Sequence, residues 1–342
     1  MKSFKVAVVG ATGAVGEVML SILEERNFPA SAVVALASER SAGTKVPYGH
    51  QQLVVQDLAT FDPTGVDIAL FSAGGATSKE YAPKFAAAGA VVIDNSSAFR
   101  YDDDVPLVVS EVNPEQVRNR PRGIIANPNC STMQMVVALG PIHRKAGIER
   151  INVATYQSVS GGGRSGLEEL GRQTAGILNF QDAEPKKFQV QIAFNLIPHI
   201  DDFQDNGYTK EEMKLVWETR KILGDDTIQV NPTAVRVPVF YGHSEAVNVE
   251  TREKISAAEV RAMLLQAPGV EVVDEPKAGG YPTPVTHASG RDAVYVGRIR
   301  DDLSHPRAVN LWIVSDNIRK GAALNAVQVA ELVAAELAAG EG

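Results

Sequence analysis

The stretch Val6-Ala7-Val8-Val9-Gly10-Ala11-Thr12-Gly13-Ala14-Val15-Gly16 decides the fold of the first part of this chain. Its first four residues are a short apolar run typical of a buried strand, and three glycines spaced three apart follow directly. Further apolar residues then recur at helical spacing: Val15, Val18, Met19, Ile22 and Leu23. A strand, a glycine-rich turn and a helix in this order predict a dinucleotide site, where backbone N–H groups hold a pyrophosphate.

Three more β-branched runs continue this pattern within the first 130 residues. They lie at Val33–Ala37, Asp67–Ser72 and Ala90–Asp94, and helical patterns alternate with them. Because parallel strands are joined by right-handed crossovers, this part predicts an α/β, Rossmann-type dinucleotide-binding domain. The glycine spacing is GxxGxxG rather than GxGxxG, so a plain turn is the alternative to a dinucleotide site.

The pattern changes after about Met133. A helical run leads to a second series of strand-like segments, namely Ile151–Ser158, Ala234–Phe240, Ala246–Thr251, Ala293–Ile299 and Leu311–Val314. They favour a second, α+β domain with a mixed sheet. The last segment, Gly321–Ala339, has the pattern of an Ala-rich amphipathic helix that returns to the first domain. The predicted domains are therefore residues 1–130 with 321–342, and residues 131–320.

Composition limits the class of partner and the compartment. The 342 residues include 33 Lys and Arg against 41 Asp and Glu, a net charge of −8. This balance argues against a nucleic acid or an anionic membrane surface as the main partner. The single cysteine, Cys130, cannot form an intrachain disulfide. The apolar run near Met1 is too short for a signal peptide, and no stretch approaches 18 uninterrupted apolar residues. We therefore expect a cytoplasmic protein with no membrane partner.

The residues after the second predicted strand indicate the type of dinucleotide. Ala37-Ser38-Glu39-Arg40-Ser41 offers a guanidinium group and hydroxyl groups to a ribose 2′-phosphate. This favours NADP over NAD. The alternative is that Arg40 is a solvated surface residue and that Glu39 binds the ribose.

Cys130 lies in the segment Asn127-Pro128-Asn129-Cys130-Ser131-Thr132, directly before the apolar helical run Met133–Leu139. At a helix start, the dipole and the unpaired N–H groups favour a thiolate and can hold an oxyanion. An ordinary thiol, with a pKa of ~8.5, is only about 3% ionised at neutral pH, so a nucleophile here needs a base. The polar lead-in is a poor setting for a buried structural cysteine, and we predict a nucleophile.

Six histidines are candidates for that base: His50, His143, His199, His243, His287 and His305. His243 stands out because it lies between two predicted strands, at a strand end where a sheet can present polar groups in a cleft. Taken alone, it also fits an ordinary surface histidine.

Two polar stretches have the composition of ligand-binding segments. The stretch Thr155–Gly163 places polar side chains at a strand end before three glycines, where a nicotinamide can lie close to the backbone; a flexible hinge is the alternative. Thr209-Lys210-Glu211-Glu212 is a capping box that starts a helix. It puts Glu211 and Lys214 one turn apart on one face, where the alternative to an anion site is a solvated ion pair.

Together these motifs resemble the aspartate-β-semialdehyde dehydrogenases of bacteria over nearly the whole chain. The matching segments are Gly10–Gly16, Asp94–Arg100, Pro128–Thr132, Tyr156–Gly161, Glu211–Lys214, Arg236–His243 and Val314–Asn317. The resemblance implies NADPH-dependent reductive dephosphorylation of L-aspartyl 4-phosphate to L-aspartate 4-semialdehyde through a cysteine thioester, with release of phosphate. It places this reaction in the biosynthesis of lysine through diaminopimelate, and of threonine, methionine and isoleucine.

The resemblance also implies roles for individual residues. Cys130 is the expected nucleophile, His243 the general acid and base, and Gln157 the residue that orients the substrate. Expected substrate contacts also include Arg236 for the α-carboxylate, Arg100 and Lys214 for the phosphate, Asn129 close by, and Glu211 near the amine. The residues expected to hold NADP are Gly10, Thr12, Gly13, Ala14, Val15, Arg40, Ser41, Ser160, Gly161 and Asn317.

Two alternative functions are open at this point. One is a related acyl-phosphate reductase such as N-acetyl-γ-glutamyl-phosphate reductase, and Arg236, Glu211 and the segment Asn129–Thr132 favour the aspartyl substrate over it. The other is a non-catalytic homologue that binds NADP, which has no need of a nucleophile such as Cys130. The family suggests a homodimer or a dimer of dimers assembled through the second domain, and no metal site is predicted.

Overall fold

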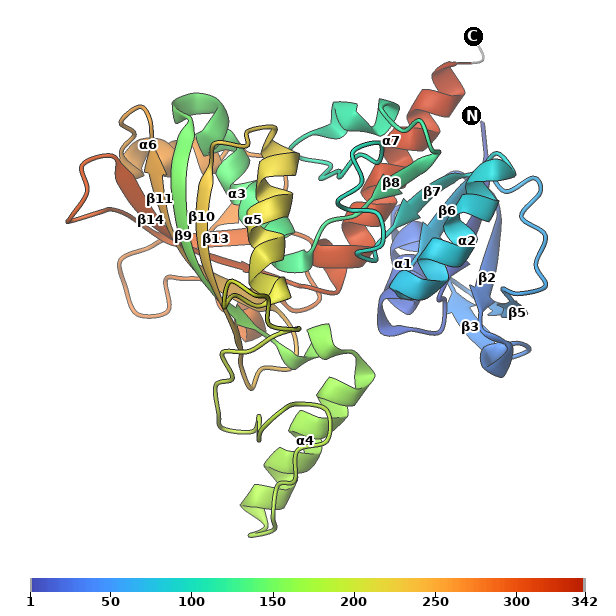
Figure 1. Cartoon of the computed structure of the whole chain (residues 1–342), viewed down its shortest axis with the longest axis horizontal. Coiled ribbons are helices and arrows are strands. Elements are labelled where there is room, and N and C mark those ends of the chain that lie inside the picture. The colour runs from blue at the N-terminus through green and yellow to red at the C-terminus, as the bar shows by residue number, and fades with distance from the viewer. Residues whose placement is uncertain (1, 341–342) are drawn as a thin grey trace. The chain divides into compact units, whose positions relative to one another are not determined.

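A computed structural model describes residues 2–340, which form two compact units (Figure 1). Among the described residues, one unit comprises residues 2–129 and 322–340, and the other comprises Cys130–Gly321. Cys130 and Gly321 thus fall in the second unit, one residue away from the predicted boundaries. Residues 1, 341 and 342, which the prediction assigns to the first domain, lie outside the described residues.

The first unit contains a six-stranded parallel sheet with the strand order β5-β2-β1-β6-β7-β8. Its strands are β1 (Phe4–Val9), β2 (Ala30–Ala37), β5 (Gln56–Asp57), β6 (Ile68–Phe71), β7 (Val91–Asp94) and β8 (Ile124–Ala126). The four predicted strands are present, while β5 and β8 were not predicted. They are only two and three residues long, so they carry little periodic signal.

Helices cover both faces of this sheet. Helix α1 (Ala14–Glu25) packs beside the C-terminal helix α7 (Asn325–Ala339) over a core that includes Val6, Val8 and Leu70. Helix α2 (Gly75–Ala87) covers the other face, where the rings of Phe85 and Phe71 meet edge to face at 5.3 Å. The remaining elements are the β3–β4 hairpin (Lys45–Tyr48 and Gln51–Val54) and the short 3₁₀ helices η1 (Glu39–Ser41) and η2 (Pro114–Arg118).

The C-terminal helix belongs to the core of the first unit. Val327, Val329, Ala330 and Val333 are fully buried there, so the helix packs with the first part of the chain. The helical segment Arg319–Ala339 has a mean hydropathy of 1.4 over its most apolar stretch. Among the described residues it is the one segment long and apolar enough, by length and composition, to cross a membrane. Buried core helices pass the same test.

The second unit contains a mixed six-stranded sheet with the order β10-β9-β11-β14-β13-β12. Its strands are β9 (Ile148–Gln157), β10 (Gln229–Arg236), β11 (His243–Thr251), β12 (Val270–Val272), β13 (Val294–Asp301) and β14 (Ala308–Ser315). The predicted strand Ala234–Phe240 was wrong in its bounds, because β10 runs from Gln229 to Arg236. Its partner β9 ends at the paired residue Gln157, and Pro238 has no N–H group to donate to a sheet.

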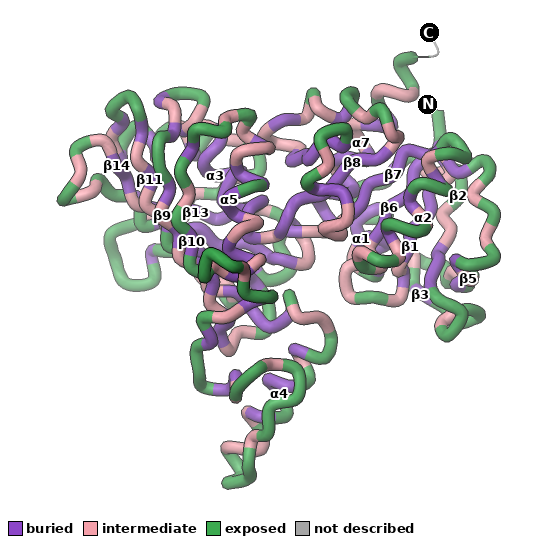
Figure 2. Tube along the Cα trace, in the orientation of Figure 1, coloured by how far each residue is buried: buried purple, intermediate pink, exposed green. Residues whose placement is uncertain are grey.

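Three helices pack against this mixed sheet: α3 (Cys130–Ala146), α5 (Lys210–Leu223) and α6 (Ala257–Leu264). Along β9, buried Val153 and Thr155 alternate with the less buried Asn152 and Ala154, so one face of the sheet is covered more fully than the other (Figure 2). Helix α4 (Arg164–Leu178) lies beyond the end of the sheet (Figure 1) and has a small core of its own around Leu170.

Candidate active site

The glycine loop follows β1 at the carboxyl end of the parallel sheet. Gly10 has a φ of +84°, and a Cβ placed on it would lie 2.5 Å from the carbonyl oxygen of Ser72. A Cβ on Gly16 would lie 2.1 Å from the carbonyl oxygen of Gly10. Only glycine therefore fits at both positions, which keeps the backbone at the start of α1 bare of side chains. This is the arrangement that a dinucleotide pyrophosphate needs.

The residues that predict the dinucleotide type lie next to this loop. The N–H groups of Gly10 and Ala11 donate to the carbonyl oxygen of Leu36 on β2, at 2.8 and 3.1 Å. Thr12 Oγ1 contacts Ser41 Oγ at 3.5 Å, while Arg40 is exposed on η1. The structure thus brings together the predicted cofactor residues of the first unit.

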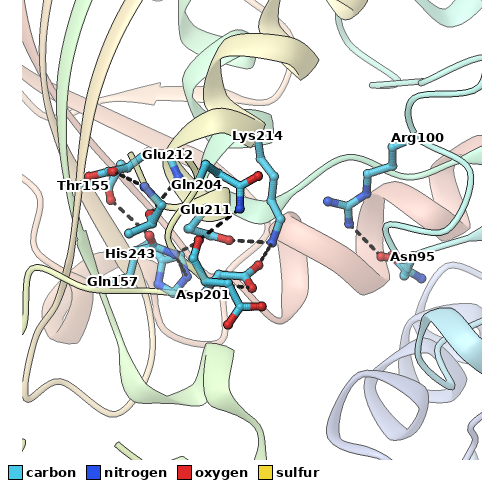
Figure 3. A network of polar contacts seen from close by, with 12 residues as sticks. Asn95, Arg100, Thr155, Gln157, Asp201, Gln204, Glu211, Glu212, Lys214 and His243 are labelled. Atoms are coloured by element: carbon cyan, nitrogen blue, oxygen red, sulfur yellow. Dashed lines mark hydrogen bonds and ion pairs between the residues drawn. The ribbon is translucent and has the colours of Figure 1, made fainter. Parts of the chain in front are cut away.

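Arg100 is fixed by the loop that follows β7. Its Nη2 group donates to the carbonyl oxygen of Asn95 at 2.8 Å, and the side chain is buried (Figure 3). Asp94 is held nearby by hydroxyl donors from Ser78 and Ser96, both at 2.6 Å. Burial raises the pKa of Asp94 even though these hydroxyl groups lower it. Asn129, also buried, is the last residue of the first unit.

Cys130 is the first residue of α3 and is half-buried. The helix therefore begins at Cys130 itself, three residues before the predicted apolar run. Gly321 packs against it within a π-helical turn, η5 (Arg319–Leu324). Asp316 caps this turn, because its Oδ1 accepts the N–H groups of Ile318 and Arg319 at 2.9 Å.

His243 is the first residue of β11 and is completely buried, so the alternative of a surface histidine was wrong. Its Nδ1 atom accepts the backbone N–H of Ser158 at 3.0 Å, which places the proton of the neutral ring on Nε2. Burial and the charge of Arg236 lower the pKa of His243 to about 3, although Glu211 acts in the opposite direction. His243 is therefore neutral at physiological pH.

A chain of polar contacts leads from His243 to α5 (Figure 3). Gln157 Nε2 lies 3.5 Å from His243 Nε2 and donates to Glu211 Oε1 at 3.0 Å. Lys214 Nζ then bridges Glu211 Oε2 and Asp201 Oδ2, both at 2.8 Å. Glu211 and Lys214 lie one turn apart as predicted. They are largely buried, so the alternative of a solvated ion pair was wrong.

Arg236 is buried at the end of β10 beside these groups. Its Nη1 group donates to the carbonyl oxygen of Ser158 at 2.7 Å. Burial lowers the pKa of Arg236, whereas Glu211 and Cys130 raise it, so both residues act electrostatically on the guanidinium. A Cβ placed on Gly161 would lie 3.1 Å from Arg236 Nη1 and 3.6 Å from His243 Nε2. The bare backbone of Gly161 therefore borders both Arg236 and His243.

Asn317 organises the turn between β9 and α4. Its Oδ1 accepts from Ser158 Oγ at 3.0 Å, Ser160 Oγ at 3.1 Å and the N–H of Gly242 at 3.0 Å. The stretch after β9 is thus a 3₁₀ turn, η3 (Val159–Gly162), tied down by side chains, rather than a flexible hinge.

The structure assigns four further residues to the site: Asp201, Ser158, Gly321 and Asp316. No local motif marks Gly321, because its contact with Cys130 depends on chain folding. Asp316 lies in the matching segment Val314–Asn317, but no role was predicted for it. Asp201 belongs to the site because it pairs with Lys214 on α5. Its backbone adopts a left-handed conformation, with a φ of +67°, and the neighbouring residues contain no glycine or asparagine turn motif that would have indicated this. Across residues 2–340, no group of three or more His, Cys, Asp and Glu side chains is arranged to hold a metal ion.

Comparisons with known proteins agree with this arrangement. Residues 5–120 match the family described as "Semialdehyde dehydrogenase, NAD binding domain", and residues 139–320 match "Semialdehyde dehydrogenase, dimerisation domain". Fold and site thus define a semialdehyde dehydrogenase, an oxidoreductase that uses a nicotinamide dinucleotide. An aspartate-semialdehyde dehydrogenase of Legionella pneumophila is 61% identical over 98% of this chain and 97% of its own length. The chain belongs to the aspartate-semialdehyde dehydrogenase family.

Solved structures of this family superpose on the chain. Aspartate semialdehyde dehydrogenase II of Vibrio cholerae, complexed with ASA, has a TM-score of 0.96 at 58% identity and covers 98% of this chain and 99% of its own. An enzyme of Candida albicans with NADP has a TM-score of 0.76 at 27% identity, with 97% and 98% coverage. The predicted family, its fold class and its enzymatic nature are thereby confirmed, and the two alternative functions lose their support.

Proposed function

We propose that this chain catalyses the NADPH-dependent reductive dephosphorylation of L-aspartyl 4-phosphate to L-aspartate 4-semialdehyde, with Cys130 as nucleophile. The observation that carries this proposal is the position of Cys130 at the first residue of α3, in electrostatic contact with Arg236. Both the helix dipole and the guanidinium favour a thiolate. The thiolate attacks the acyl carbon, phosphate leaves, and a thioester joins the aspartyl group to Cys130.

Binding of the substrate is assigned to the charged groups around Gln157. Arg236 presents a planar fork that suits the α-carboxylate, and Glu211 supplies a negative charge for the amine. Lys214 is held by two carboxylates and carries the positive charge for the leaving phosphate. Arg100 has the same role in the first unit, with Asn129 as a further substrate contact. Gln157 links these groups to His243 and orients the substrate.

Management of the proton beside the reacting carbonyl is assigned to His243. Because Ser158 donates to Nδ1, the Nε2–H group of the neutral ring donates a hydrogen bond to the oxyanion that forms on the thioester carbonyl during reduction. The ring keeps its proton when this thiohemiacetal oxyanion collapses to the aldehyde and the Cys130 thiolate, so it never becomes an anion. NADPH supplies the hydride when it is bound. The glycine loop fits its pyrophosphate, and Thr12 to Val15, Ser160, Gly161 and Asn317 are its further proposed contacts.

NADP is proposed over NAD on the basis of Arg40 and Ser41, which lie beside the glycine loop at the end of β2. An arginine donates charge-assisted hydrogen bonds to a 2′-phosphate that NAD lacks. Arg40→Ala is expected to raise the KM for NADP about 10-fold or more and to leave the KM for NAD unchanged. The measurement is the oxidation of aspartate semialdehyde with each dinucleotide in turn. An equal change for both would contradict this assignment.

The decisive experiment measures the phosphate-dependent oxidation of aspartate semialdehyde with NADP. Cys130→Ala should abolish turnover and leave NADP binding, measured by fluorescence titration, largely intact. Iodoacetamide should inactivate the native enzyme stoichiometrically, because the chain has no other cysteine. Turnover by Cys130→Ala at the native rate would refute the mechanism. We place this reaction in the biosynthesis of lysine, threonine, methionine and isoleucine, in the cytoplasm.

We further propose that two copies of the chain associate through the less covered face of the mixed sheet. Asn231, Asn152, Asn248 and Asn310 are paired across four neighbouring strands on this face, with amide hydrogen bonds of 3.1 and 3.0 Å at its two ends. The rings of Tyr156 and Trp312 pack beside this row at 5.7 Å. Light scattering should show a dimer or a dimer of dimers. Ala246→Arg on this face should yield monomers, whereas Lys254→Glu, outside the strands, should not.

A further inference from the structure

Phe188 lies against Arg236, the residue proposed to bind the substrate carboxylate. The guanidinium carbon of Arg236 is 6.0 Å from the centroid of the Phe188 ring. The same ring packs against the turn after β9, because a Cβ placed on Gly162 would lie 3.6 Å from its Cε1 and Cζ atoms. A Cβ on Gly166 would lie 3.3 Å from Cζ. The ring therefore fills a defined place between this turn and the guanidinium.

The backbone of Phe188 is held by a buried carboxylate on α4. Glu169 is only 3% exposed, and its Oε2 accepts the N–H groups of Lys186, at 2.9 Å, and of Lys187. Its Oε1 accepts the N–H of Phe188 at 3.3 Å and a side-chain N–H of Gln173 at 3.1 Å. Three consecutive backbone amides around one carboxylate form an anion-binding nest, which fixes this loop strongly.

The same helix holds the far end of the loop. Gln173 is fully buried, and its Oε1 accepts the N–H groups of Ile192 and Ala193 at 2.9 and 3.1 Å. Two side chains one turn apart on α4 thus satisfy five backbone amides of a segment without regular secondary structure. These contacts order the segment, because each backbone residue held in one conformation loses conformational entropy that an interaction must offset.

Arg236 is thereby restrained in two directions. Ser158 holds the edge of the guanidinium through Nη1, and Phe188 lies close to the group. We propose that Phe188, held in place by Glu169, is a positioning residue that sets the plane of the Arg236 guanidinium for the α-carboxylate of the substrate. This rests on the proposed function of Arg236. A preorganised fork loses less entropy when it binds a carboxylate at two points.

Steady-state kinetics with aspartate semialdehyde, phosphate and NADP test this proposal. Phe188→Leu is expected to raise the KM for aspartate semialdehyde about 2- to 30-fold, the range of a cation–π contact of ~0.5–2 kcal/mol. The kcat and the KM for phosphate should stay within about twofold. Phe188→Tyr, which keeps the ring, should behave like the native enzyme. Phe180→Leu is the matched control, because the ring of Phe180 is fully exposed just after the end of α4.

Glu169→Gln tests the link to α4. It should raise the same KM, and the double variant Phe188→Leu with Glu169→Gln should be no worse than Phe188→Leu alone, because both act through Arg236. A fall in kcat together with a rise in every KM would mean general disruption and would overturn the proposal.

Arg236→Ala distinguishes a failure of the proposed function of Arg236 from a failure of the proposed role of Phe188. If it leaves the KM for aspartate semialdehyde unchanged, the proposed function of Arg236 fails. If it raises that KM and Phe188→Leu does not, only the role of Phe188 fails.

Discussion

Gly321 lies directly against Cys130: a Cβ placed on Gly321 would come within 2.6 Å of the Cβ of Cys130 and 3.2 Å of its Cα. Real Cβ atoms do not approach a neighbour so closely, so any side chain at Gly321 must displace the start of α3. Gly321 cannot easily move away from Cys130, because the N–H group of Gly321 donates to the carbonyl oxygen of Asp316 at 3.0 Å. The position of Cys130 thus depends on a glycine nearly two hundred residues away in the sequence.

We expect Gly321→Ala to lower kcat about 10- to 100-fold in the aspartate semialdehyde assay, because a misplacement of about 1 Å costs roughly 100-fold. The rate of iodoacetamide reaction with Cys130 should change as well. The control is Gly171→Ala on α4, where an added Cβ meets nothing within 4 Å. That helical substitution should leave kcat unchanged and slightly raise stability. Equal kinetics for both variants would show that Gly321 has no role.

The pKa of His243, lowered to about 3 by burial and Arg236, predicts how stability depends on pH. In the unfolded chain the ring of His243 becomes protonated below about pH 6.5. In the folded protein the ring stays neutral down to about pH 3. The native protein therefore loses stability as pH falls through this window, by about 2–3 kcal/mol from this residue between pH 7 and 4.5. Urea denaturation of His243→Asn should lack this loss. His50→Asn, at an exposed position, should behave like the native protein.

Lys214 is predicted to matter for phosphate rather than for the aldehyde. Burial lowers the pKa of Lys214, but Glu211 and Asp201 raise it by more, so the ammonium group stays charged. Lys214→Met keeps most of the side-chain volume and removes that charge. We expect the KM for phosphate to rise about 10- to 100-fold, the usual worth of a charged hydrogen bond. Lys210→Met, at the first residue of the same helix, is the control and should change neither KM.

Much of the fold follows from local sequence pattern, whereas much of the site depends on distant pairing. The loop at Gly10, the strand at Val6–Val9 and the capping box at Thr209 are local features, and the structure contains each of them. His243 is different, because Gly242-His243-Ser244-Glu245 has the polar composition of an exposed turn. It is buried because β11 pairs with both β9 and β14, where His243 lies opposite Ser315. The hydrophobic pattern of the residues next to His243 in the sequence cannot predict this burial, because it depends on pairing with distant strands.

Glu245 is a second buried group on β11 that local sequence does not predict. It is completely buried beside Gln134 on α3. Burial raises the pKa of Glu245 well above 4.5, although the side chain of Gln134 acts in the opposite direction. The raised pKa means that this group stabilises the fold fully below about pH 4.5 and that the contribution is lost as pH rises. Glu245→Gln, which keeps the shape without the charge, should raise the free energy of unfolding at pH 8 by about 1–3 kcal/mol. At pH 4 it should change little. An equal effect at both pH values would contradict this.

The two capping boxes of the second unit separate helix stability from substrate binding. Thr209 and Ser256 each accept the N–H of the glutamate three residues later, at 3.3 Å, at the starts of α5 and α6. Replacing either with alanine should lower the free energy of unfolding by about 1 kcal/mol. Only α5 carries Glu211 and Lys214 in its first turns, so fraying of its start moves both groups. Thr209→Ala should therefore also raise the KM for phosphate a few-fold, whereas Ser256→Ala should leave it unchanged. If both variants raised that KM equally, loss of stability alone would explain the effect, and the first turn of α5 would have no special part in binding.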